Sequence, residues 1–387
     1  MARRTRNILF GSTLRRSLQK SFGALARQVV RNSADAMVKA ARVAASTAPT
    51  GKRSRPKRSS PKRSRAQPQS KPASKLRSTA IAKIDLGMLT GAANGREYQL
   101  YLPPDLKKSE RLPLIVMLHG CAQNAHAMAV CSQMNRLAAR ERFVVLYPQQ
   151  NQFSNAQRCW NWFDTRSGRA QRESDAILAA INLTCVNQPV DPKRIVLAGF
   201  SAGAGMAALL ATRHPERLLA VVMHSGVAPG VAHSVTTALS AMRGRRAGGP
   251  LAVLPDATSL PALLVIQGSA DRVVACSNGA GAAQRWATLA NQLAYGKQGG
   301  EAASSLALPA SVKVSSPRIV RRGSRRSTTV TDYRSGSRIV ATLCEIVGLG
   351  HAWSGGKRGV AYSDSTGPDA SRMVWAFARR QFVLGLE

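Results

Sequence analysis

The order of apolar and polar positions along the chain predicts a sheet of buried strands that alternate with helices. Runs that are apolar almost throughout occur at 112–118, 143–147, 194–198, 219–224, 261–267 and 339–346. Such runs are typical of parallel strands buried on both faces, and 96–104 alternates like a strand and then breaks at its prolines. Helical patterns occupy 127–140, 173–186, 202–213 and 369–384. We therefore expect an α/β fold, with a mostly parallel central sheet and helices on both faces.

The first part of the chain differs from the rest in composition. The 387 residues carry a net charge of +37, and residues 1–80 hold 21 Lys and Arg against one acid. An apolar stripe predicts a basic amphipathic helical segment over 1–45, and 46–84 reads as a disordered linker rich in Lys, Arg, Ser and Pro. A folded domain then covers 85–387. Within it, 233–258 and 297–330 are expected as surface loops or small excursions.

Charge alone suggests partners for the N-terminal part. A basic amphipathic helix suits an anionic lipid or a polymer-granule surface, and basic clusters bind polyanions through counterion release. The alternatives are a helix docked on the chain's own domain and a poorly ordered tail. No recognition motif accompanies the charge, so specific nucleic-acid reading is not expected. No apolar run is long enough for a transmembrane segment, and no secretory signal is visible in 1–45.

One short motif stands between a predicted strand and a predicted helix. Gly199-Phe200-Ser201-Ala202-Gly203 follows the apolar run 194–198 and opens the alanine-rich run 202–213. A strand that turns at once into a helix holds a serine in a strained conformation with its hydroxyl exposed, and glycines are needed where a Cβ would clash. Ser201 is therefore the candidate nucleophile, with the helix N-terminus favouring negative charge beside it.

A serine nucleophile needs a histidine base and a carboxylate that orients the histidine. His351 follows the last predicted strand in a glycine-flanked turn, whereas His214, His224 and His233 lie at a helix end, a strand end and a loop. Asp271 directly follows the strand 261–267. The other candidate acids do not directly follow a predicted strand in this way; they are Asp256, Asp332, Asp364 and Asp369. Ser201, Asp271 and His351 are the predicted catalytic residues.

Ester cleavage also needs donors for the oxyanion. The backbone N–H of Ala202 and that of Cys121, which follows the strand ending in His119-Gly120, are expected to supply them. His119 precedes the serine and is expected to brace this loop. The six cysteines show no metal-like spacing, so no metal site is predicted, and buried thiols and disulfides both stay open.

Several motifs together resemble the PHB-depolymerase family of esterases, which is related to feruloyl and acetylxylan esterases. They are Leu118-His119-Gly120-Cys121-Ala122-Gln123, Cys159-Trp160-Asn161-Trp162-Phe163, the Ser201 motif, the Asp271 segment, and Gly350-His351-Ala352-Trp353-Ser354-Gly355-Gly356. The resemblance covers about 95–385. It implies an α/β-hydrolase fold, no cofactor, and carboxylic-ester hydrolysis with polyhydroxyalkanoate polymer or oligomers as the leading substrate. It also suggests that Trp160, Trp162 and Trp353 bind substrate, with core packing as the alternative.

Members that degrade extracellular polymer usually carry a signal peptide and a polymer-binding domain. The basic front of this chain instead favours oligomers or an amorphous granule, and an intracellular, granule-associated location is the expectation. The rival functions are a feruloyl or acetylxylan esterase, a serine peptidase on the same scaffold, and a granule- or polyanion-binding protein with an inert hydrolase domain.

Overall fold

The computed structural model describes residues 88–246, 251, 257–295 and 311–384, all within the unit Gly87–Glu387. The predicted segments 1–45 and 46–84 lie outside the described residues and stay predictions. The strands are β1 (Met88–Ala93), β2 (Arg96–Tyr101), β3 (Leu112–Leu118), β4 (Val144–Pro148), β5 (Val190–Phe200), β6 (Ala220–His224), β7 (Ala262–Gly268), β8 (Lys313–Val314), β9 (Arg318–Val320), β10 (Thr328–Ser335), β11 (Arg338–Ile346), β12 (Trp353–Ser354) and β13 (Ser363–Asp364). The helices are α3 (Ala125–Ser132), α4 (Met134–Glu141), α5 (Arg169–Asn187), α6 (Ala202–Arg213), the 3₁₀ turn η1 (Pro215–Arg217), α7 (Val235–Met242), α8 (Ser277–Tyr295) and α9 (Ala370–Leu384).

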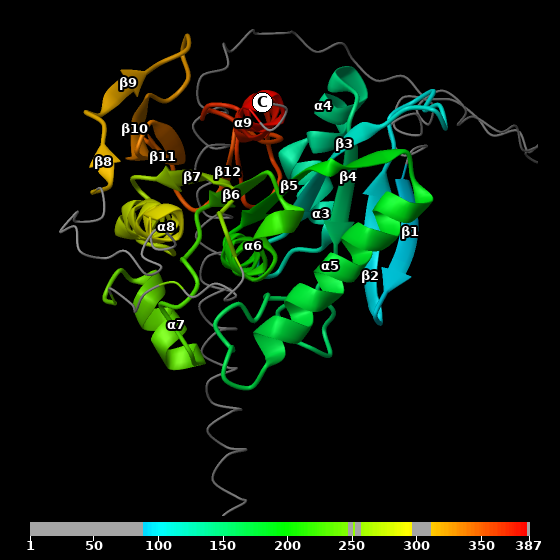
Figure 1. The fold of residues 1–387 in the computed structure, drawn as a ribbon, viewed down its shortest axis with the longest axis horizontal. Coiled ribbons are helices and arrows are strands. Elements are labelled where there is room, and N and C mark those ends of the chain that lie inside the picture. Colours follow the sequence, from blue (N-terminus) through cyan, green and yellow to red (C-terminus); the bar gives the residue numbers. More distant parts are fainter. Residues whose placement is uncertain (1–87, 247–250, 252–256, 296–310, 385–387) are drawn as a thin grey trace, which may run out of the picture. The chain divides into compact units, whose positions relative to one another are not determined.

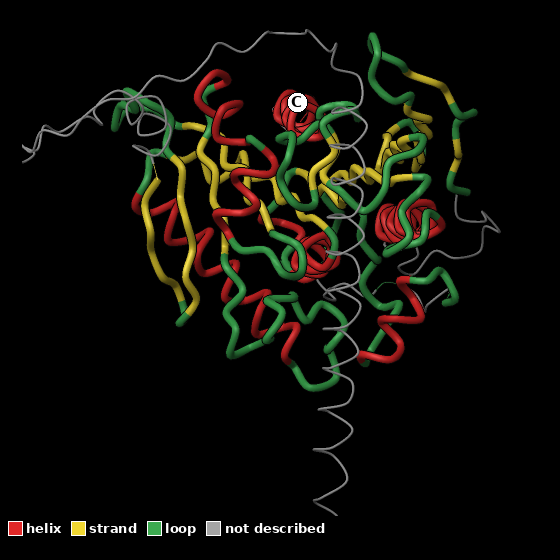
Figure 2. The backbone as a smooth tube through the Cα atoms, turned by 180° about the vertical axis from the view of Figure 1, so that it is seen from behind, coloured by secondary structure: helices red, strands yellow, loops and turns green. Residues whose placement is uncertain are grey.

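The central sheet is parallel in its middle and antiparallel at both ends. Its strand order is β1-β2-β4-β3-β5-β6-β7-β11-β10-β8, and β9 pairs with β10. Neighbours from β4 to β11 are parallel, whereas β1, β2, β8, β9 and β10 pair antiparallel with their neighbours. Figures 1 and 2 show these strands side by side with helices around them, and the arrangement confirms the predicted fold class.

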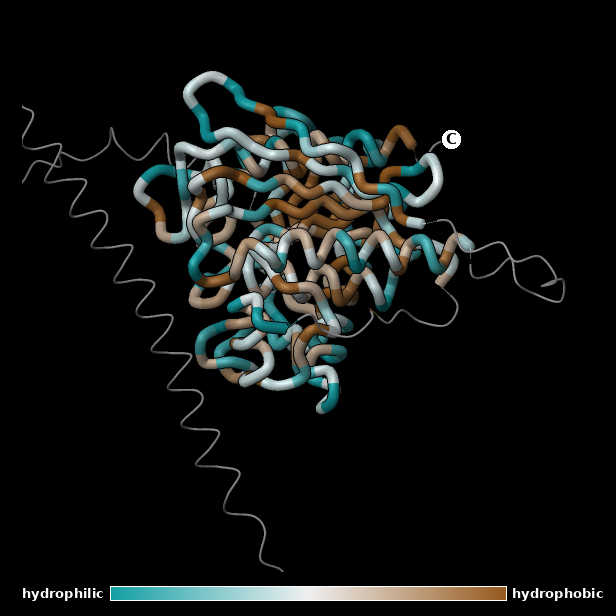
Figure 3. Tube along the Cα trace, turned by 90° about the vertical axis from the view of Figure 1, so that its left-hand side faces the viewer, coloured by the Kyte–Doolittle hydropathy of each residue, from teal (hydrophilic) through white to brown (hydrophobic). Residues whose placement is uncertain are grey.

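Both faces of the sheet are covered because its middle strands are apolar over most of their length. In β3, Leu114 and Val116 pack into one core cluster, with side chains of α5, α6 and α8. The alternate residues Ile115 and Met117 pack into a second cluster, with α3, α4 and α9. Figure 3 shows these central strands as a hydrophobic band between the helical layers. The two cores fix the carboxyl ends of the parallel strands along one edge.

One helix that the sequence predicts as continuous is broken in the structure. The pattern at 127–140 predicts a single helix, but the structure has α3 and α4 with a break at Gln133, whose φ is +55°. The Ser132 hydroxyl donates to the carbonyl oxygen of Met128 at 2.8 Å and accepts from the Met134 N–H at 3.3 Å. A serine hydroxyl that bonds the backbone in this way competes with helix continuation.

The two stretches expected as surface loops or small excursions contain helix and strand in their described parts. Residues 233–258 contain α7, whose N-terminus is closed by a capping box between Ser234 and Thr237. The described part of 297–330 contributes β8, β9 and the start of β10, which lengthen the sheet beyond β11. β8 and β9 are short and β10 is rich in polar residues, so none of them has the apolar run that marks the central strands.

Candidate active site

Ser201 lies at the turn between β5 and α6. Its backbone has φ +57° and ψ −118°, a conformation that an L-residue adopts only under strain. The turn is tight: a Cβ on Gly199 would lie 2.1 Å from the Gly203 carbonyl oxygen, and one on Gly203 would lie 2.4 Å from that of Leu118. The backbone N–H of Ser201 donates to His224 O at 2.9 Å, which anchors the turn to β6. The hydroxyl is thereby held at the carboxyl edge of the sheet.

His351 lies in the loop that follows β11. Its Nε2 is 2.9 Å from Ser201 Oγ, and its Nδ1 is 2.8 Å from Asp271 Oδ2. An ionised carboxylate only accepts hydrogen bonds, so we assign the ring proton to Nδ1, which leaves Nε2 free to accept from the serine hydroxyl. The imidazole also packs on Phe200, with ring centroids 5.0 Å apart. The three predicted catalytic residues are therefore in contact.

Asp271 follows β7 and is buried. The backbone N–H groups of Val273 and Val274 both donate to its Oδ1 at 2.9 Å. Burial raises the pKa of this carboxyl, but the hydrogen bond and charge of His351 and the two N–H donors outweigh it and bring the pKa below its ordinary value. Asp271 is thus held as a carboxylate with one oxygen fixed by the backbone and the other turned to His351.

The competing histidines lie in other settings. His214 is 3.7 Å from Asp175, and His233 is 3.5 Å from the Thr165 hydroxyl. His224 is fully buried; its Nδ1 is 3.1 Å from Ser225 Oγ and its Nε2 accepts from the Ser354 N–H at 3.2 Å. Burial first, and then the neighbouring His351, lower the pKa of His224 to about 3. His224 is therefore a neutral packing residue beneath the site.

The competing carboxylates form ion pairs elsewhere. The described ones pair with nearby arginines, as Asp332 with Arg318, Asp364 with Arg326, and Asp369 with Arg372. Asp256 lies outside the described residues. Asp271 is the predicted acid that the structure brings to His351.

The backbone amides expected as oxyanion donors, those of Ala202 and Cys121, lie near Ser201 and are unbonded in the described part of the chain. Within the described part of the chain, neither the Ala202 N–H, the first amide of α6, nor the Cys121 N–H has a hydrogen-bond partner. Cys121 follows β3, the neighbour of β5 in the sheet, and the Gly203 backbone packs against the end of that strand. Both amides are therefore available as donors at the same edge.

The loop that carries Cys121 is tied down by a disulfide and by His119. Cys121 and Cys159 are bonded, with Cα atoms 4.2 Å apart, and the four other cysteines are free thiols. The Ala122 N–H donates to Gln157 O at 2.7 Å. His119 is buried, its Nε2 accepts from the Gln150 N–H at 3.1 Å, and burial lowers its pKa to about 4. This bracing agrees with the role expected for His119.

A buried carboxylate beneath this loop was not predicted. Glu173 is 1% exposed; its Oε1 accepts from Gln150 and Asn161 side chains at 2.8 and 2.6 Å, and its Oε2 accepts from the Asn161 N–H at 2.8 Å. Arg96 bonds the Gln150 side chain and lies over the Trp160 ring at 5.6 Å. A sequence signal was present: Glu173 begins the apolar stripe of α5 that continues at Ala176, Ile177, Ala180 and Ile181. An acid on such a stripe indicates a buried, bonded carboxylate.

The three predicted substrate-binding tryptophans lie in the core. Trp160, Trp162 and Trp353 are 0%, 5% and 1% exposed. The Trp160 indole donates to His119 O at 3.0 Å, and Trp353 stacks on His224 at 4.9 Å. This burial favours the packing alternative, in which the rings support the residues around the site.

Two kinds of feature, metal-binding clusters and membrane-spanning helices, are absent from the part of the chain that the structure describes. No group of three or more His, Cys, Asp and Glu side chains is arranged there for a metal ion. None of the helices in the same ranges is long and apolar enough to cross a membrane.

Comparison with known proteins gives relatives of this chain. It is 34% identical over 131 residues to poly(3-hydroxyalkanoate) depolymerase C of Paucimonas lemoignei, covering 34% of this chain and 31% of that protein. It is 30% identical over 141 residues to feruloyl esterase B of Thermothelomyces thermophilus, covering 36% and 47%. The chain thus spans between about a third and a half of these curated relatives.

Solved structures support the fold. An acetyl xylan esterase from Aspergillus awamori superposes with a TM-score of 0.51 at 18% identity, covering 68% of this chain and 93% of that one. The sequence profile of the family described as Esterase PHB depolymerase matches residues 96–303. Since this match spans more than half of the chain, the resemblance found in the motifs is confirmed: the chain belongs to the Esterase PHB depolymerase family.

Proposed function

We propose that this chain is a serine esterase that hydrolyses short-chain polyhydroxyalkanoate, as polymer or as oligomers. The observation that carries the catalytic part is the chain of short contacts from Ser201 through His351 to Asp271. The observation that favours the polyester is the likeness to the depolymerase of Paucimonas lemoignei. Family membership supports ester chemistry over a binding protein with an inert hydrolase domain.

The reaction would proceed through an acyl-enzyme. Ser201 Oγ attacks the ester carbonyl while His351 Nε2 takes the hydroxyl proton and then gives it to the departing alcohol. Asp271 keeps the ring proton on Nδ1 and stabilises the imidazolium. The Ala202 and Cys121 N–H groups donate to the oxyanion, where each donor contributes about 3 kcal/mol. Water, activated by the same histidine, releases the acid. No step in this sequence calls for a metal or cofactor.

The second candidate is hydrolysis of feruloyl or acetyl esters on sugars. The likeness to feruloyl esterase B is the observation that favours it. Both candidates use the same nucleophile and differ in the acyl and alcohol groups on either side of the ester bond. A serine peptidase on this scaffold is a third, weaker candidate, which assays on amide bonds would test.

The N-terminal residues are proposed to bring the domain to its substrate. Residues 1–80 carry 21 of the chain's 56 Lys and Arg, and anionic granule surfaces attract such segments. The test is granule association of the chain before and after deletion of 1–80. Equal association of the two forms would contradict this contact and leave the ester chemistry untouched.

The substrate is tested by release of hydroxybutyrate from amorphous polyhydroxybutyrate by the full chain, with Ser201→Ala as the blank. We expect release that disappears in the variant. Cleavage of a simple butyrate ester without release from the polymer would discard the polyester and put the sugar esters first. Absence of both activities would contradict the esterase.

A further inference from the structure

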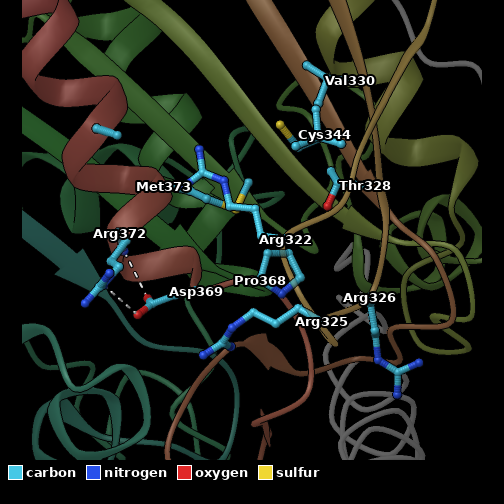
Figure 4. A pocket seen from close by; sticks show the side chains of 12 residues that line it. Arg322, Arg325, Arg326, Thr328, Val330, Cys344, Pro368, Asp369, Arg372 and Met373 are labelled. Atoms are coloured by element: carbon cyan, nitrogen blue, oxygen red, sulfur yellow. Dashed lines mark hydrogen bonds and ion pairs between the residues drawn. The ribbon is translucent and has the colours of Figure 1, made fainter.

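A pocket rich in arginine lies on the flank of the sheet beyond β11. Arg322 and Arg325 reach it from the loop before β10, and Arg372 and Met373 reach it from α9. Its apolar floor includes Val330 and Cys344, which face each other across the β10–β11 pair. Figure 4 shows the Arg322 side chain next to Met373 and Pro368, with the Arg325 and Arg372 guanidinium groups farther from Val330 and Cys344. The pocket therefore offers positive charge directly beside an apolar surface.

Two of these cations have no carboxylate partner among the described residues. Arg322 makes no side-chain hydrogen bond or ion pair there, and Arg325 donates only to the Gly367 carbonyl oxygen, at 2.6 Å. By contrast, Arg372 lies 3.5 Å from Asp369. A backbone carbonyl does not neutralise a guanidinium, so the charge of Arg322 and Arg325 remains available to a ligand.

The pocket lining includes Thr328, which lies at the same edge of the sheet as Ser201. Thr328, the first residue of β10, pairs with Ile346, the last residue of β11, and β11 runs parallel to β7. Four strand spacings of about 4.8 Å separate β5 from β10, so a ligand held here lies well away from the serine hydroxyl. A small ester at Ser201 would not reach it, so only a chain of several ester units could span the distance.

We propose that this pocket binds the free carboxylate end of a short oligoester of hydroxy acids, and this rests on the proposed function. Every cleavage of such a chain leaves a carboxylate at one end and methyl-bearing units behind it. Guanidinium groups match a carboxylate through paired N–H donors, and the Val330, Cys344 and Met373 surface suits the apolar units. An anionic ligand with an apolar body therefore complements both the guanidinium groups and the apolar surface of the pocket.

The chain offers a closely matched pair of variants. Arg322→Gln removes a cation that lines the pocket without breaking a side-chain hydrogen bond or ion pair to the described residues. Arg321→Gln removes an exposed neighbouring cation that lies outside the pocket lining and is equally without a side-chain partner there. Both lower the net charge by one, so long-range attraction changes equally. A difference in ligand affinity between the two variants is therefore due to the pocket and not to the net charge.

The test is calorimetric titration of the full chain, carrying Ser201→Ala to prevent cleavage, with the 3-hydroxybutyrate trimer at low ionic strength. We expect the trimer acid to bind about tenfold more weakly when Arg322→Gln is added, and within twofold of the parent when Arg321→Gln is added. The trimer methyl ester, which lacks the charge, is expected to bind as weakly as the acid does to Arg322→Gln.

Three results would contradict binding of the carboxylate end in this pocket. They are equal affinity for the acid and its methyl ester, equal losses of affinity for the acid in the two variants, and binding of inorganic phosphate as tight as that of the acid. The proposed function is judged separately, by cleavage of the trimer by the chain with Ser201 intact. Hydrolysis of p-nitrophenyl butyrate by Arg322→Gln is expected to be unchanged. A fall in that activity, too, would contradict a pocket remote from the serine.

Discussion

His351 Nε2 lies 2.9 Å from Ser201 Oγ, although 150 residues separate the two along the chain. The sheet makes this contact, because β5 and β11 both end at its carboxyl edge. The loop after β11 passes close to β7: a Cβ on Gly268 would lie 2.2 Å from the Leu349 carbonyl oxygen. The position of the histidine therefore depends on close backbone packing of this loop.

The role of Asp271 predicts the effect of removing its charge. Asp271→Asn is expected to lower kcat for p-nitrophenyl butyrate by about 10³- to 10⁴-fold with little change in KM, because an amide does not hold the proton on His351 Nδ1. Asp369→Asn is the control, since Asp369 pairs with Arg372 and does not contact the triad. Steady-state kinetics of both variants make the comparison. Equal kcat values would remove Asp271 from the mechanism.

The tight turn at the nucleophile predicts a difference between two glycines. Gly203→Ala is expected to cost about 1–3 kcal/mol of unfolding free energy and to lower kcat, because the new Cβ would meet Leu118 O at 2.4 Å. Gly281→Ala in α8 meets nothing within 4 Å and is expected to be neutral or to stabilise by up to about 1 kcal/mol. Chemical denaturation with activity assays tests both. A harmless Gly203→Ala would refute the packing argument.

The sequence allowed the meeting of Ser201, Asp271 and His351 to be predicted more fully than the contacts that support them. Ser201, Asp271 and His351 each follow a strongly apolar strand, so topology alone brings them to one edge. β10 and its small partners were missed because residues 311–330 carry arginine, serine and glycine instead of an apolar run. The pairing of Cys121 with Cys159 and the identity of the partners of Glu173 depend on distant contacts that no local pattern encodes, although the stripe of α5 indicates that Glu173 is buried.

The disulfide predicts a link between stability and the oxyanion donor. Cys159→Ser is expected to lower the unfolding free energy by about 3–4 kcal/mol, since the bond closes a loop across a sequence separation of 38. It should also lower kcat, because the Cys121 amide loses its tether. Cys185→Ser, which removes a free thiol, is the control. Thermal melts and butyrate-ester kinetics measure both effects. An unchanged kcat in a destabilised Cys159→Ser variant would contradict the proposal that the disulfide holds the Cys121 amide in position.

The two buried histidines predict loss of stability in mild acid. An unfolded histidine takes up a proton near pH 6.5, whereas the pKa values of folded His119 and His224 are about 4 and 3. Between these values the unfolded state binds more protons, so the unfolding free energy falls as the pH is lowered. Each histidine should cost about 2 kcal/mol between pH 7 and pH 5.

Urea titrations at pH 7 and pH 5 test this dependence. His224→Gln keeps a polar side chain without a titratable ring, and it is expected to reduce the difference between the two pH values by about 2 kcal/mol. His126→Gln, at an exposed position on α3, should leave the difference as it is. Equal differences in all three proteins would show that His224 does not supply the effect.

The central claim is that Ser201 is activated by His351, and covalent labelling tests it most directly. A fluorophosphonate reacts with activated serine hydroxyls, and peptide mass spectrometry locates the adduct. We expect one adduct, on Ser201, formed in step with the loss of butyrate esterase activity. His351→Gln should slow labelling by about 10³-fold or more, because the base is gone. An adduct on another serine, or equal labelling rates in the two proteins, would contradict the account.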